Sequence, residues 1–109
     1  MDMIVLNIKK DVEDLLDTAD LFYRGDEYSG LKAMEVGTQK LLAIVDAIVK
    51  ISSQDSTNIS VDFNYINSAL SAILEAYEKK DGILLADLLT FELLDYVQEV
   101  IELCEDRGE

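Results

Sequence analysis

The sequence predicts an all-α protein, an antiparallel up-down four-helix bundle in one domain spanning residues 1–109. Apolar residues recur at spacings of three and four, the period of a helix that buries one face. No stretch alternates between apolar and polar residues as a half-buried strand does, and the chain contains no Pro. Turn-forming residues divide the pattern into four segments with short connections, which makes consecutive helices antiparallel neighbours.

The first two helices are expected at about residues 5–24 and 29–51. The apolar stripe of the first is Ile8, Val12, Leu15, Leu16, Ala19, Phe22 and Tyr23. It stops at Arg24-Gly25-Asp26, where Gly can take a left-handed C-cap conformation and Asp26 or Ser29 can cap the next helix. The stripe of the second helix is Leu31, Met34, Thr38, Leu41, Leu42, Val45, Ile48 and Val49.

The last two helices are expected at about residues 59–79 and 83–105, after a polar loop at residues 52–58. The stripe of the third is Ile59, Phe63, Ile66, Leu70, Ile73, Leu74 and Tyr77. A charged break at residues 79–82 separates it from the fourth helix. The stripe of the fourth is Leu85, Ala86, Leu89, Leu93, Tyr96, Val97, Val100 and Cys104.

An internal repeat relates the two halves of the chain. A shift of 55 positions places apolar or turn residues of the first half on similar residues of the second, among them Phe22 on Tyr77, Arg24 on Lys79, Asp26 on Asp81 and Leu42 on Val97. The bundle is then two repeated helical hairpins. Duplication is one interpretation, and two hairpins that obey the same packing and capping rules is the other.

The charge of the chain restricts its partners. It has 23 acidic and 9 basic side chains, a formal charge of -14 and 50% hydrophobic residues. This combination predicts an apolar core inside an acidic surface, and it argues against nucleic acid and anionic membranes as partners because both would be repelled. No run of about 18 apolar residues is present to span a membrane. One Cys and no signal-peptide pattern favour a cytoplasmic protein.

The residue types favour a non-enzymatic protein without a cofactor or a bound metal. The absence of His removes the common catalytic triads, zinc sites and di-iron sites of helical bundles. Cys104 lies on a core stripe and is expected to be a buried, inert thiol. No Gly-rich phosphate loop follows a strand. We therefore expect no small-molecule substrate.

The fourth helix has a second apolar face. Leu84, Leu88 and Phe91 lie opposite its core stripe at spacings of four and three. The third helix adds a line of small or aromatic residues that also points away from its stripe. Together these six residues, the predicted strip, are a candidate partner-binding site: Leu84, Leu88, Phe91, Tyr65, Ala69 and Ala72. Two alternatives stay open, that the assumed helix rotation is wrong and that residues 1–6 fold back over the strip.

Residues 61–100 carry a resemblance to a known family. The pattern combines Ile66, Ala69 and Leu70 with a charged turn and an apolar run, namely Ala76-Tyr77, Lys79, Asp81 and Leu85-Ala86-Asp87-Leu88-Leu89. It resembles the C-terminal hairpin of flagellar export chaperones, small acidic helical bundles of the cytoplasm that hold flagellin. The resemblance implies that Leu84, Leu88 and Phe91 contact a client protein.

The sequence thus predicts a bundle that binds protein, like an export chaperone or small adaptor, by docking a partner helix on the predicted strip. One alternative is a structural homodimer that uses the strip as its subunit interface. Another is an acidic mimic that binds a basic protein, whose complex would depend steeply on salt.

Overall fold

The computed structural model describes residues 2–53 and 59–107, and within these ranges it is helical with no strand. The segments are α1 (Asp2–Tyr23), α2 (Glu27–Ser52), α3 (Phe63–Glu78), α4 (Gly82–Asp87), the π-helix η1 (Leu88–Leu94) and α5 (Asp95–Arg107). The last three follow one another without a break and are here called helix four. The predicted all-α bundle is confirmed.

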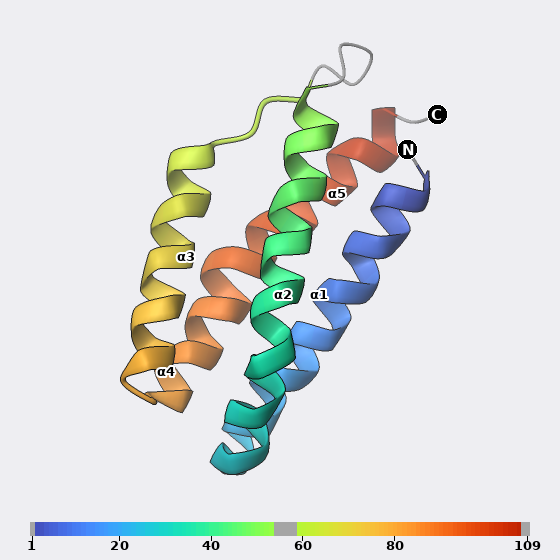
Figure 1. The fold of residues 1–109 in the computed structure, drawn as a ribbon. Coiled ribbons are helices and arrows are strands. Elements are labelled where there is room, and N and C mark those ends of the chain that lie inside the picture. Colours follow the sequence, from blue (N-terminus) through green and yellow to red (C-terminus); the bar gives the residue numbers. More distant parts are fainter. Residues whose placement is uncertain (1, 54–58, 108–109) are drawn as a thin grey trace.

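The four helices form two antiparallel hairpins. In Figure 1, α1 and α2 join at the lower end of the molecule, and α3 joins helix four at the same end. α1 packs closely on α2 and on α4, whereas α3 packs on α4 and η1. Among the described helices, α2 and α3 share almost no close backbone contact. The neighbours in space are therefore α2, α1, helix four and α3, in that order.

Three helices begin two or more residues away from their predicted starts. α1 begins at Asp2, so residues 2–6 extend the first helix. α3 begins at Phe63 and not at residue 59, because the Asp62 carboxylate accepts a hydrogen bond from the Tyr65 N–H and caps the helix there. α2 begins at Glu27, with Asp26 as its cap. Residues 54–58 of the predicted loop lie outside the described residues.

The two hairpin turns have the same backbone structure, 55 positions apart. In the first, the Gly25 N–H donates to Phe22 O and the Asp26 N–H to Leu21 O, at 3.0 and 2.9 Å. In the second, the N–H groups of Lys80 and Asp81 donate at 3.1 and 3.0 Å to Tyr77 O and Ala76 O. Both are Schellman C-caps, with a left-handed residue at Gly25 (φ 84°) or Lys80 (φ 56°).

The side chains of the turns repeat as well. Asp26 and Asp81 each cap the helix that follows, accepting from the N–H three residues later. Arg24 pairs with Asp20, as Lys79 pairs with Glu75, one helical turn earlier in each case. The predicted repeat therefore describes the turns correctly.

Phe22 joins the two turns. Its buried ring lies against Gly30 in α2 and Gly82 at the start of α4. A Cβ atom on Gly30 would lie 2.7 Å from the ring, and one on Gly82 would lie 2.5 Å from it, closer than real Cβ contacts. The second hairpin can approach the ring this closely because Gly82 lacks a side chain, and the ring fits within the first hairpin because Gly30 lacks one.

The core stripes of α2 and α3 were only partly predicted. Leu42, Val49 and Leu74, which we expected in the core, are exposed. The buried residues of α3 are Ile66, Ala69, Ile73 and Ala76, which lie 54 positions after Val12, Leu15, Ala19 and Phe22 of α1. The two turns are related by 55 positions, whereas these buried residues are related by 54. Because consecutive residues of an α-helix are about 100° apart, the buried face of α3 is rotated by about 100° relative to that of α1. The cause is that α3 packs on helix four and not on α2.

The π-helix shifts the repeat by one residue. Up to Leu89, near the start of η1, equivalent buried residues of α2 and helix four are 55 positions apart, as in Gly30 with Leu85 and Met34 with Leu89. After η1 they are 56 positions apart, as in Leu41 with Val97, Ile44 with Val100 and Ile48 with Cys104. The predicted alignment of Leu42 with Val97 is therefore wrong. η1 accommodates one residue more than the matching part of α2, because π-turns are wider than α-turns.

Within the described residues, no helix is both long and apolar enough to cross a membrane.

Candidate functional site

The outer face of helix four is apolar near its start. Phe91 is 66% exposed and Leu84 46% exposed, while Leu88 between them is half-buried. The inner face of the same stretch is completely buried, at Leu85, Leu89 and Leu93. The side chains of Leu84 and Phe91 thus contribute nothing to the core, and they lie as the sequence predicted.

Tyr65 borders this apolar face from α3. Its hydroxyl donates to the backbone carbonyl of Glu92 at 2.8 Å and lies 3.1 Å from the Glu92 carboxylate. Its ring packs against that of Tyr96, with 5.1 Å between the ring centroids. Burial and the hydrogen bond to Glu92 raise the pKa of Tyr65. These contacts hold one edge of the face in place.

Tyr23 borders the face from α1. Its hydroxyl bonds to the Asp87 carboxylate at 2.5 Å, and burial together with this bond raises its pKa. The helical spacing predicts Tyr23 on the core stripe of α1, but its side chain is exposed. Its spacing of one residue from Phe22 could have revealed this, since adjacent residues of a helix do not share a face.

The predicted strip needs one correction. Ala69 is only 7% exposed and packs in the core, because α3 turns its small residues towards helix four. Ala72 on the same helix is half-buried, and Tyr65 is 37% exposed. We call the resulting surface the observed strip, made of Leu84, Leu88, Phe91, Tyr65, Ala72 and Tyr23.

The N-terminal residues do not cover the observed strip. Residues 2–6 continue α1 as a helix, with Val5 buried in the core. The alternative that residues 1–6 fold back is therefore removed for residues 2–6, while residue 1 lies outside the described residues.

Comparison with protein families identifies a relationship that covers most of the chain. A family described as a domain of unknown function, DUF8042, matches residues 8–103. The chain belongs to the DUF8042 family. Comparisons with curated proteins and with solved structures gave no match.

The DUF8042 chain has a second apolar surface, between α2 and α3. An open pocket of about 560 Å³ is lined there by Tyr28, Leu31, Lys32, Glu35, Tyr77, Glu78 and Lys80. Leu42, Val49 and Leu74 are exposed farther along the same two helices. The pocket holds two lysines and two glutamates, so its rim favours neither a basic nor an acidic ligand.

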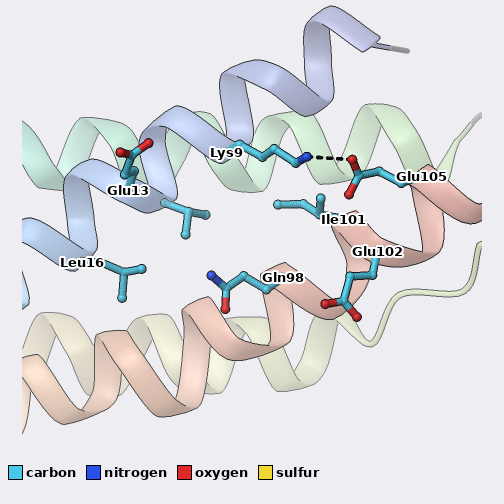
Figure 2. A pocket seen from close by; sticks show the side chains of 8 residues that line it. Lys9, Glu13, Leu16, Gln98, Ile101, Glu102 and Glu105 are labelled. Carbon is cyan, nitrogen blue, oxygen red and sulfur yellow. Dashed lines mark hydrogen bonds and ion pairs between the residues drawn. The ribbon is translucent and has the colours of Figure 1, made fainter.

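A third surface of the DUF8042 chain lies between α1 and α5. Figure 2 shows side chains of both helices around an open groove of about 430 Å³, which an ion pair of 2.6 Å between Lys9 and Glu105 crosses. Val12 and Ile101 are buried at this groove, and Leu16 is half-buried. Unlike the α2–α3 pocket, this groove has more acidic than basic residues.

The core contains little that could act chemically. Burial raises the pKa of the Cys104 thiol and the nearby Glu105 adds to the rise, so the thiolate is disfavoured. Among the described residues, no three His, Cys, Asp or Glu side chains are grouped to hold a metal ion.

Lys40 of α2 lies 2.9 Å from Asp14 and 3.7 Å from Asp11 of α1, an arrangement that ties these two helices together.

Proposed function

We propose that the protein is a non-enzymatic helical bundle that binds another protein, in the manner of an export chaperone or small adaptor. A helix of the partner docks on the observed strip. The observation that supports this most is the exposure of Leu84 and Phe91 on a helix whose opposite face is fully buried. A cytoplasmic location is part of the proposal, because the single Cys suits a reducing compartment.

The geometry of the strip suits a helical partner. Leu84, Leu88 and Phe91 lie along about two turns of helix four, the spacing at which a partner helix presents its own apolar residues. Hydrogen bonds at Tyr65 and Tyr23 hold the two edges, so docking requires little rearrangement. Ala72 offers a small side chain against which a partner backbone could approach closely.

Site-specific photocrosslinking in cells tests the proposal. A photoreactive phenylalanine analogue replaces Phe91 in one variant and Leu42 in another, since Leu42 is similarly exposed (68%) but lies on α2. We expect one protein to crosslink through position 91 and not through position 42. That protein, once identified and purified, should bind the wild type, and Phe91→Ser should raise its Kd roughly 10- to 100-fold through lost apolar burial.

The same experiment has outcomes that contradict the proposal. Crosslinks only between two copies of the chain, together with a dimer in light scattering, would make the strip a subunit interface. Equal crosslinking from both positions, or an unchanged Kd for a folded Phe91→Ser variant, would show that the strip does not bind the partner.

A further inference from the structure

The groove between α1 and α5 has an apolar floor and two carboxylates at its rim. The floor consists of Val12, Leu16 and Ile101. Glu13 lies on the α1 side and Glu102 on the α5 side, and among the described residues neither forms an ion pair. The groove shares no residue with the observed strip.

The charge of the groove selects the chemistry of its ligand. Lys9 is neutralised by Glu105, so Glu13 and Glu102 give the rim an excess of negative charge. The whole chain adds to it with a formal charge of -14. Anionic ligands and a second copy of this acidic chain would be repelled, whereas a cationic ligand would be attracted.

The apolar floor narrows the choice further. Lysine and arginine combine an aliphatic stem with a charged head, so the stem can lie on apolar surface while the head reaches a carboxylate. A basic amphipathic helix presents such side chains next to leucine-like ones on one face. The groove provides both features at one place: apolar surface at Leu16 and Ile101, and two carboxylates for the charged heads.

We propose that the α1–α5 groove binds a basic amphipathic segment of a partner protein. The leucine-like side chains of this segment contact Leu16 and Ile101, and its lysines or arginines pair with Glu13 and Glu102. The inference goes beyond the proposed function, because it assigns a second surface and the charge of the ligand there, and it holds or fails independently of the observed strip.

Fluorescence anisotropy with synthetic helical peptides tests the groove on the full chain. The probes are an amphipathic Leu/Lys peptide, a Ser/Lys peptide of equal charge and a Leu/Glu peptide. The variant Glu13→Gln/Glu102→Gln is compared with Glu35→Gln/Glu78→Gln, which removes the same charge at the α2–α3 pocket. A third variant, Leu84→Ser/Phe91→Ser, reports on the observed strip. Circular dichroism verifies that all variants are folded.

We expect the Leu/Lys peptide to bind most tightly and to lose about fivefold in affinity in the groove variant, the loss of two exposed ion pairs. The Glu35→Gln/Glu78→Gln variant should change the affinity for the peptide by less than about twofold. A peptide bound in the α1–α5 groove does not pair with these two glutamates, and salt screens distant charges. In methyl NMR spectra, the signals of Leu16 and Ile101 should shift when the peptide is added.

Three results would overturn the inference. Equal losses in the two Gln variants would mean that the peptide responds only to net charge. Equal binding of the Ser/Lys peptide would mean that the apolar floor is not used. A loss confined to Leu84→Ser/Phe91→Ser would place the peptide on the observed strip, which rejects the groove and leaves the proposed function standing.

Discussion

The α1–α2 hairpin and the hairpin formed by α3 and helix four begin from equivalent turns and then diverge. Both turns have the same hydrogen bonds, the same left-handed position and the same capping Asp. After the first turn α2 runs as one α-helix of 26 residues, whereas helix four contains a π-helix at its centre. A short capped turn can therefore be kept while the helices it joins acquire different surfaces.

Because the two hairpins diverge after their turns, they expose different residues to solvent. α3 packs through a face rotated by one position relative to α1, and helix four exposes Leu84 and Phe91 on its outer face. Equivalent residues of the two hairpins therefore experience different environments. Substitutions at equivalent positions measure how different these environments are.

The largest difference is expected at Phe22 and its counterpart Tyr77. Phe22 is buried between two glycines, whereas Tyr77 is half-buried beside the α2–α3 pocket. Phe22→Ala should lower the free energy of unfolding by about 3–5 kcal/mol, because it leaves a cavity between the turns. Tyr77→Ala should cost clearly less in urea denaturation. Equal losses would show that the two aromatic residues have equivalent roles.

A smaller change in the free energy of unfolding is expected at the two residues with a positive φ, Gly25 and Lys80, and its sign is opposite in the two hairpins. Lys80→Gly should stabilise the protein by roughly 1 kcal/mol, since Gly adopts a positive φ without steric cost. Gly25→Ala should destabilise it by a similar amount, although no atom would crowd the new Cβ. Thermal unfolding of both variants checks this. If Lys80→Gly is destabilising, the second turn does not have the conformation described above.

The smallest effect concerns Lys40, whose ion pairs with α1 have no counterpart among the described residues of the second hairpin. The hydrogen bond to Asp14 raises the pKa of Lys40 above its ordinary value of 10.5. The ion pairs of Lys40 therefore stabilise the fold fully at pH values below 10.5, and this stabilisation is lost as the pH rises through the raised pKa of Lys40. Lys40→Met should cost roughly 0.5–1 kcal/mol at pH 7, and the variant and the wild type should converge at high pH.

Urea denaturation at several pH values measures this difference. Lys10→Met is the control, because Lys10 is exposed and, within the described residues, forms no ion pair. A difference between wild type and Lys40→Met that persists at high pH would exclude the ion pairs as its cause.

The helices and turns could be predicted because their signals are local. Spacings of three and four, the capping Asp residues and Gly25 act within a few residues of one another. The π-helix could also have been suspected. Five core residues of helix four follow one another at a strict spacing of four, namely Leu85, Leu89, Leu93, Val97 and Ile101. In an α-helix such a series drifts by about 40° per step, so only a wider turn keeps it on one face.

The arrangement of the helices could not be predicted in the same way. Ala69 is buried and Leu74 exposed because α3 packs on helix four and stays apart from α2, a choice made by distant residues. Leu84 was placed correctly because it lies in the α-helical turn before the π-helix, and Phe91, at the middle of the π-helix, is still only partly displaced by its wider turns. The α1–α5 groove needs both helices in place, so neither of their patterns indicates it alone.

The ring of Phe22 also determines how the chain can fold. It belongs to the first hairpin but contacts Gly82, the residue that begins the last helix, far along the sequence. A fragment that ends at residue 53 would leave this ring without half of its enclosure. The two hairpins are therefore expected to unfold together in a single cooperative transition, and neither should be an autonomous folding unit.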